Sequence, residues 1–85
     1  MVKFSATGAM MTSSDYKVRF KAEYWQVKHR YDRLHDMLVR ADAGKLDFTP
    51  TCPLDLLRDQ AAAMGKYLYI LEVRAQMEDV DLFAD

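Results

Sequence analysis

The sequence lacks the disulfide bonds and structural metal sites that often stabilise a small domain. It has one cysteine, Cys52, so no intrachain disulfide can form, and the residue spacings typical of zinc or redox sites do not occur. No run of about 18 apolar residues is present, and the first 14 residues have no apolar stretch of signal-peptide length. We therefore expect an unsecreted protein of a reducing cytoplasm that does not associate with membranes.

The sequence also lacks an excess of charge of either sign. Its 12 basic and 13 acidic residues give a net charge of -1. A strongly basic protein would be expected for binding to DNA, RNA or an anionic membrane. We therefore expect no nucleic-acid partner, and any phosphate must be bound by a local group of residues.

Patterns typical of catalysis and metal binding are missing as well. His29 and His35 are six residues apart, which places them on different faces of a helix rather than at the i,i+4 spacing of paired metal ligands. No nucleophile elbow and no glycine-rich phosphate loop occur. Glu78, Asp79 and Asp81 are most simply an acidic tail. We expect no catalytic residue, no metal and no cofactor.

Glycine and proline are few, and their positions divide the chain. Ser13, Ser14 and Asp15 signal a helix start, and Gly44 signals its end. Pro50 and Pro53 prevent one uninterrupted helix. We predict a flexible arm over 1–14, a helix over 15–43, a loop over 44–52 and a helix over 53–79 followed by a short acidic tail. Cys52 is the expected N-cap of the second helix, with Pro53 as its first helical residue.

Both predicted helices carry an apolar seam that alternates steps of four and three residues, the pattern of helices that pack against each other. The short loop between the helices favours an antiparallel hairpin. The predicted fold is therefore all-α, a two-helix hairpin with a flexible N-terminal arm. The seam residues are Phe20, Tyr24, Val27, Tyr31, Leu34, Leu38 and Ala41 in the first helix, and Leu57, Ala61, Met64, Leu68, Leu71 and Ala75 in the second.

Further apolar residues lie outside these seams, and one partner helix cannot cover them. We expect them to form the interface of a homo-oligomer, since a domain of 85 residues needs an additional source of stability. The alternative is that these helix faces bind a different protein in a helix-in-groove contact. The candidate interface residues are Val18, Ala22, Trp25, Gln60, Ile70, Val73 and Met77.

The loop before the second helix is a candidate anion site. Thr49, Thr51 and Cys52 place donors beside the unpaired backbone amides of a helix start, which is the arrangement that phosphate requires. Asp55 lies in the same turn and competes for those amides. Ordinary capping of the helix therefore remains an equally simple interpretation.

Tyrosine and arginine side chains are candidates for contacts to a base and to further phosphates. Tyr67 and Arg74 repeat with Gln60 at intervals of seven residues, which fits an interface or a pocket between hairpins. Arg30 is the third candidate, because arginine can stack on a purine and bind its phosphate. Core packing of the tyrosines remains the alternative interpretation.

Between about Tyr16 and Leu82 the chain resembles a family of small phage and prophage proteins that is related to a crAss-like phage protein. The loop from Leu46 to Pro53 is the most specific part of this similarity. The helical residues that carry it are Tyr16, Arg19, Glu23, Tyr24, Arg30, Tyr31 and Leu34, followed by Leu56, Leu57, Gln60, Ala63, Met64, Tyr67, Leu68, Leu71, Glu72, Arg74 and Ala75.

This resemblance implies a phage-encoded helical hairpin that acts in the cytoplasm of the host cell. In architecture the chain is also similar to phage sponge proteins, which bind cyclic nucleotides made by bacterial defence systems. The expected function is sequestration of a nucleotide-derived immune signal, a cyclic oligonucleotide or a cyclic ADP-ribose, without catalysis. The alternative is a module that binds a host or phage protein.

Overall fold

A computed structural model describes residues 2–84 and contains three α-helices: α1 (Phe4–Met11), α2 (Tyr16–Asp42) and α3 (Leu54–Met77). No strand occurs among these residues. The prediction of an all-α protein is therefore confirmed. None of the three helices is both long enough and apolar enough to cross a bilayer within the described part of the chain.

The ends of α2 follow from local capping chemistry. At the start, the carboxylate of Asp15 accepts a hydrogen bond from the Lys17 amide at 2.9 Å. At the end, Gly44 has a φ of 71°, and the Lys45 amide donates to the Arg40 carbonyl at 2.8 Å. These two features make a Schellman motif, which satisfies carbonyls that the helix leaves unpaired.

The start of α3 differs from the predicted start by one residue. Pro53 is the N-cap, with φ -58° and ψ 141°, and the first helical residue is Leu54. The prediction of Cys52 as N-cap and Pro53 as first helical residue is therefore wrong. The proline ring fixes φ alone, so Pro53 can keep an extended ψ while its carbonyl accepts from the Leu57 amide at 3.2 Å.

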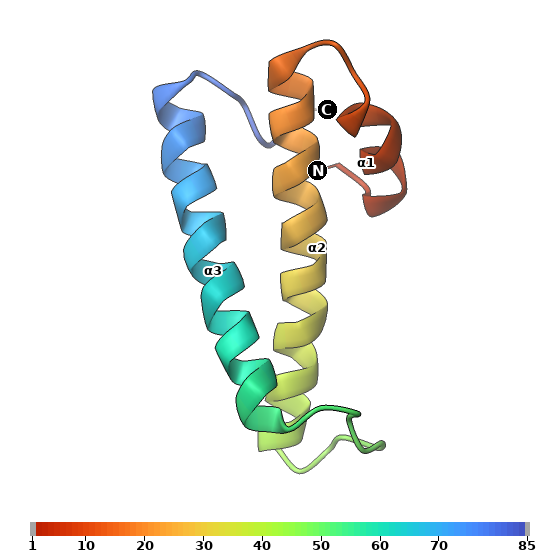
Figure 1. Cartoon of the computed structure of the whole chain (residues 1–85). Helices are drawn as coiled ribbons and strands as arrows, with labels where there is room; N and C mark the ends of the chain where they lie inside the picture. The colour runs from red at the N-terminus through yellow and green to blue at the C-terminus, as the bar shows by residue number, and fades with distance from the viewer. Residues whose placement is uncertain (1, 85) are drawn as a thin grey trace.

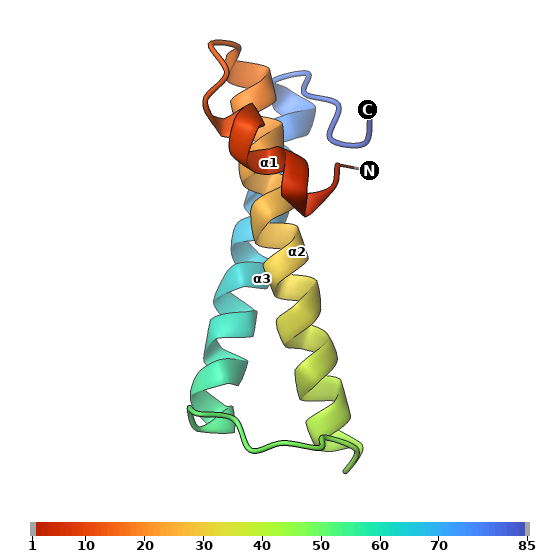
Figure 2. The same cartoon turned by 90° about the vertical axis from the view of Figure 1, so that its right-hand side faces the viewer.

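Helices α2 and α3 lie side by side and run in opposite directions (Figures 1 and 2). Every residue of the two predicted seams is buried or partly buried. Where the helices approach closely, the Tyr31 ring lies beside Gly65, at 3.4 Å from the position that an added Cβ would take. The seam pattern therefore identified the packed faces of both long helices.

The N-terminal segment differs from the predicted flexible arm. Residues 4–11 form α1, which packs against α2 on the side away from α3 (Figure 1). Val2 and Thr7 are buried, and His29 Nε2 lies 2.8 Å from the Val2 carbonyl oxygen. The hydroxyl of Thr7 donates to the Phe4 carbonyl at 2.7 Å. Tertiary contacts thus order a segment whose serine, threonine and glycine content favours a loop.

The Trp25 face of α2 is covered within one chain, contrary to its predicted role in an oligomer interface. Ala22 and Trp25 are 0% and 3% exposed, and Val18 is partly buried. Trp25 Nε1 donates to the Leu82 carbonyl at 2.7 Å, and its ring meets that of Phe83 edge to face. The N-terminal helix and the C-terminal tail therefore occupy the surface for which the sequence predicts contact with a second subunit.

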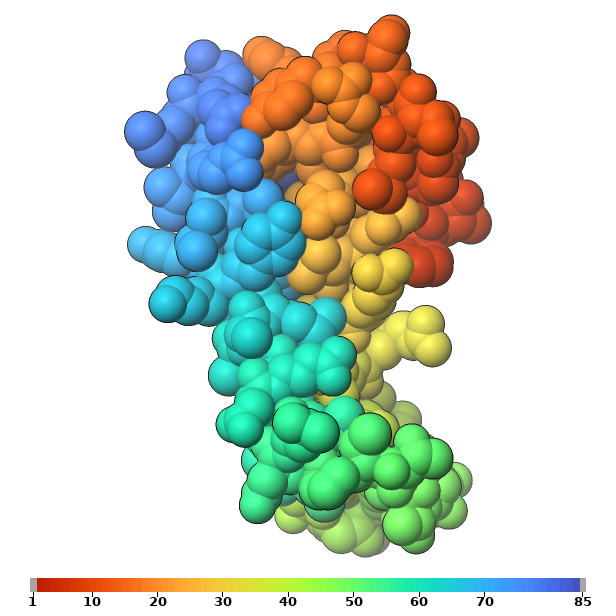
Figure 3. Space-filling view, viewed as in Figure 1, coloured from red at the N-terminus to blue at the C-terminus, as the bar shows by residue number. Residues whose placement is uncertain are grey.

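The core lies mainly in the half of the hairpin that is remote from the loop. The main cluster of buried side chains comprises Val2, Phe20, Tyr24, Trp25, Leu68, Leu71, Ala75, Val80 and Leu82. The molecule measures 43 × 24 × 18 Å. Figure 3 shows a broad upper part, where α1 adds to the two long helices, above a narrower part that ends in the loop.

Candidate functional site

The loop side chains predicted to bind phosphate are open to solvent. Thr49, Thr51 and Cys52 are all exposed. The backbone amide of Leu57, in the first turn of α3, bonds within the helix, and no side chain caps the helix start. The loop therefore presents accessible donors without a preformed cradle in the single chain.

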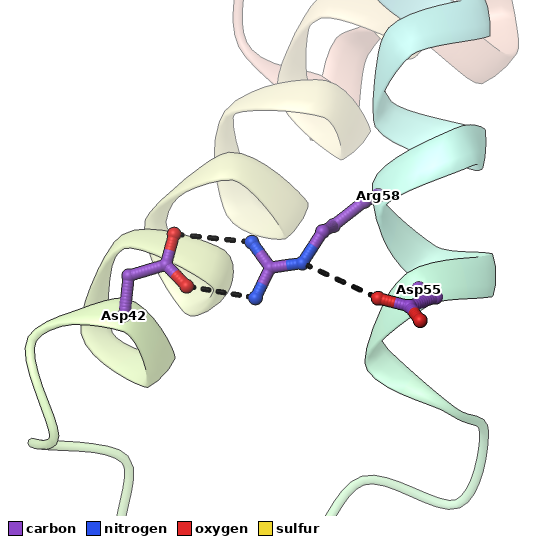
Figure 4. A network of polar contacts seen from close by, with 3 residues as sticks. All are labelled: Asp42, Asp55 and Arg58. Atoms are coloured by element: carbon purple, nitrogen blue, oxygen red, sulfur yellow. Dashed lines mark hydrogen bonds and ion pairs between the residues drawn. The ribbon is translucent and has the colours of Figure 1, made fainter.

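An ion pair between α2 and α3 closes the hairpin behind this loop (Figure 4). Arg58 donates to both carboxylate oxygens of Asp42, at 2.7 and 3.0 Å, and its Nε lies 4.0 Å from Asp55. Hydrogen bonding from Arg58 lowers the pKa of Asp42 below its ordinary value. The guanidinium is thus committed to a structural contact.

Tyr67 and Arg74 lie nearer the other end of the hairpin, where each bonds to a carboxylate. The Tyr67 hydroxyl donates to Glu23 at 3.1 Å. Arg74 donates to Glu78 at 3.1 Å and to the Tyr16 hydroxyl at 2.9 Å. Burial, followed by the bond to Glu23, raises the pKa of Tyr67. Hydrogen bonds from Tyr16 and then from Arg74 lower the pKa of Glu78.

The six predicted ligand residues do not meet at one place in a single chain. Arg74 lies about 30 Å along α3 from the helix start that follows Thr51 and Cys52, at about 1.5 Å per residue. Arg30 lies on α2, with its guanidinium 5.9 Å from the centre of the Phe4 ring. One chain therefore cannot bring the loop donors and Arg74 to the same small ligand.

A shallow groove of about 400 Å³ lies between α2 and the loop, and we name it the loop-side groove. It contains two guanidinium groups and an exposed aromatic ring. Its lining residues are Arg33, Leu34, Asp36, Met37, Arg40, Leu46, Asp47 and Phe48. Arg30 is exposed and precedes Arg33 by three residues, so these two arginines share a face of α2.

The groove offers chemistry suited to a nucleotide. Phe48 is 55% exposed, which leaves its ring open for a base to stack on. Arg40 pairs with Asp36 at 3.1 Å, whereas Arg33 makes no ion pair with any of residues 2–84. Arg33 can therefore receive a phosphate without first giving up a carboxylate.

The sequence places Arg40 close enough to the loop to complete the anion site and Arg33 among the arginines that could stack on a base, but neither is in the predicted ligand set, and Phe48 has no predicted ligand role. Their signal was present, because Arg33 and Arg40 are seven residues apart on α2 and Phe48 directly precedes Thr49. What the sequence could not give is the path of the loop, which returns Phe48 to the side of α2.

A second groove, of about 700 Å³, lies between α3 and the C-terminal tail, and we name it the tail-side groove. Its lining includes the carboxylates of Glu72, Asp79 and Asp81 but no lysine or arginine. Carboxylates repel phosphate and accept hydrogen bonds from hydroxyl or ammonium groups. This groove is therefore the poorer place for an anionic ligand.

Comparison with known protein families gives a match that covers the long hairpin. The Sequestin family model matches residues 14–77. The chain belongs to the Sequestin family. The Sequestin match includes α2, the loop and all of α3, so it contains the whole loop-side groove but excludes α1 and the tail that follows Met77. No curated protein and no solved structure matches the chain.

Proposed function

We propose that this protein is a phage anti-defence protein that binds a nucleotide-derived immune signal and sequesters it without turning it over. The observation that carries the proposal is the loop-side groove, in which Arg33, Arg40 and Phe48 lie inside the region that matches the Sequestin family. The family name itself suggests sequestration. The ligand class, a cyclic oligonucleotide or a cyclic ADP-ribose, comes from the resemblance to phage sponge proteins.

The groove supplies binding groups for each part of such a ligand. The guanidiniums of Arg33 and Arg40 can each donate two hydrogen bonds to phosphate oxygens. The Phe48 ring offers a face to the base. Leu34 and Met37 give the groove an apolar floor against which the ligand can lose water.

Binding without chemistry is supported by the kind of side chains that line the groove. They include no serine, cysteine, lysine or histidine. Of the two aspartates, Asp36 pairs with Arg40, and Asp47 lies on the exposed loop. Such a set can hold a phosphodiester but contains no pair of nucleophile and base. The ligand should therefore be released from the protein uncleaved.

We test the proposal by heating the purified protein with a panel of cyclic di- and trinucleotides and cyclic ADP-ribose isomers. A ligand should raise the melting temperature and be recovered intact after the protein is denatured. The double variant Arg33→Ala/Arg40→Ala should bind that ligand at least about tenfold more weakly, because each charge-assisted bond contributes roughly 1.5–3 kcal/mol.

Lys3→Ala is the matched control, since it removes an exposed cation that lies outside the groove. It should bind as the wild type does. If no member of the panel raises the melting temperature or is recovered, sequestration of such signals is refuted. Recovery of a cleaved nucleotide would instead refute binding without catalysis.

A further inference from the structure

The outward face of α3 carries a second heptad seam, which we name the outer seam. Its seven residues alternate steps of three and four along the helix, and all seven are exposed. They are Leu56, Asp59, Ala63, Lys66, Ile70, Val73 and Met77. The positions seven residues apart, from Leu56 to Met77, are all apolar.

Contacts within the chain leave the outer seam uncovered. Helix α2 packs on the opposite side of α3, where Ala61, Leu68 and Leu71 are buried, and α1 packs on α2. The exposed fractions remain 43% for Ile70 and 78% for Met77. An apolar stripe with this repeat is the sequence pattern of a helix that packs along another helix.

The two charges in the outer seam determine which partner and which direction fit. In a parallel pair of copies, Asp59 would face the partner's Asp59, and Lys66 would face the partner's Lys66. In an antiparallel pair, Leu56 can lie against the partner's Val73, which sets Asp59 opposite the partner's Ile70. In that register the two Asp59 carboxylates lie far apart, and each is about one turn from the partner's Lys66. We infer that two copies of this chain pair antiparallel along their outer seams, because that direction separates the carboxylates and flanks the two central lysines with them.

This pairing has a consequence for the ligand site, and that consequence rests on the proposed function. In the same register the partner's Arg74 falls at the level of the first two turns of α3, beside the other copy's loop. Tyr67, which flanks the outer seam, comes close to the two-fold axis. Two subunits would thus unite the loop donors with the arginine that lies about 30 Å away in one chain.

Cysteine cross-linking tests the pairing without any ligand. In a Cys52→Ser background, protein carrying Leu56→Cys is mixed with protein carrying Val73→Cys and then oxidised. The antiparallel pair should give a covalent dimer from the mixture and little from either variant alone. A dimer from Leu56→Cys alone would show the parallel arrangement and overturn the inference.

Exchange of the charges gives an independent measurement, the molar mass in solution by light scattering. Asp59→Lys and Lys66→Asp should each weaken the dimer, and the double exchange should restore it, because the pair again becomes complementary. Ile70→Lys should give a monomer that keeps its helical circular dichroism, whereas Val39→Lys, at an exposed position on α2, should remain dimeric.

A wild-type chain that stays monomeric at all concentrations, or an outer seam occupied only by an unrelated protein, would overturn the inference. Neither result would bear on whether the loop-side groove of one chain binds a nucleotide. Conversely, a dimer that binds no member of the nucleotide panel would leave the pairing standing and refute the proposed function.

Discussion

Arg58 on α3 makes a bidentate hydrogen-bonded ion pair with Asp42 on α2 (Figure 4). This side-chain contact joins the two helices next to the loop. Both side chains are open to solvent, so water and salt screen their attraction. The geometry nonetheless favours the charged form of Asp42, which is why its pKa lies below the ordinary value of 3.8. The contribution of the pair to stability is therefore dependent on pH.

Asp42→Asn should lower the melting temperature at neutral pH by a few degrees at most. Because the folded pKa is the lower one, the wild-type carboxylate contributes its full stabilisation above about pH 3.8 and loses it as pH falls through the folded value. The difference in melting temperature between variant and wild type should therefore disappear below the folded pKa of Asp42. Melting curves recorded at a series of pH values measure this difference.

Asp55→Asn is the matched control, because Asp55 lies 4.0 Å from Arg58 and is fully exposed. It should change the melting temperature less than Asp42→Asn at every pH. A gap for Asp42→Asn that persists at acid pH would contradict the assignment of its effect to the charge pair.

Individual residues show where sequence reasoning reached its limit. The charges and donors of Thr49, Cys52 and Arg74 could be identified from residue type, yet their separation along the hairpin follows only from the direction of the helices. Trp25 lies opposite the seam, and this position alone predicts an interface residue. Its burial depends on Leu82 and Phe83, which are 57 and 58 residues away in sequence. Contacts of that range leave no periodic signal.

At the scale of elements, the ends of helices were predictable where one residue type dominates the local geometry. Asp15 and Gly44 mark the ends of α2 in the sequence as they do in the structure. The end of α3 uses the same Schellman geometry, with Asp79 at a φ of 56° and the Val80 amide bonded to the Ala75 carbonyl at 2.9 Å. Aspartate adopts this conformation less readily than glycine, so the sequence marks this stop less sharply, and the predicted end at residue 79 lies two residues beyond Met77.

Two glycines should respond oppositely to alanine. Gly65→Ala should raise the free energy of unfolding by about 0.5–1 kcal/mol, because alanine favours a helix interior and its Cβ would meet Tyr31 at 3.4 Å, an ordinary contact distance. Gly44→Ala should lower it by about 1 kcal/mol, because a Cβ is strained at a φ of 71°. Urea unfolding of both variants measures the difference. A loss of stability for Gly65→Ala would show that Tyr31 cannot accommodate the added methyl group.

Helix α1 was not predictable as an element, because its composition favours a turn or a mobile segment. It has no side-chain cap at its start and no acidic residue in its first turn. Its order comes from packing on α2, through Phe4 against the His29 ring and through the burial of Val2 and Thr7. Tertiary contact therefore overrides local preference here.

For the whole molecule, the fold class and the antiparallel seams could be predicted because both depend on a short repeat in the sequence. The position of the core could not, because it depends on two terminal segments that meet over one face of α2. The candidate site divides in the same way. Its arginines and aromatic rings were visible as residue types, but the groove that joins Arg33 with Phe48 required the path of the loop.

Removal of residues 1–12 should expose Ala22 and part of Trp25. The expected loss is about 2 kcal/mol or more in the free energy of unfolding, on the scale of one large apolar side chain. Trp25 is the single tryptophan, so its fluorescence reports directly on this face. We expect a red-shifted emission that acrylamide quenches more strongly.

The substitution Gly8→Ala is the control, since no atom lies within 4 Å of the added methyl group. It should leave the emission unchanged and strengthen α1 slightly. An emission spectrum identical to the wild type after removal of residues 1–12 would show that α1 does not shield Trp25.

The placement of Trp25 and Cys52 also equips the chain with an internal distance gauge. The indole is buried near the two terminal segments, whereas the thiol is exposed beyond the far end of α2, about 25 Å away along the helix axis. Each residue type occurs once. A fluorescent acceptor attached to the thiol would therefore report, through energy transfer from a single donor, any bending or splaying of the hairpin when a ligand or a second subunit is added.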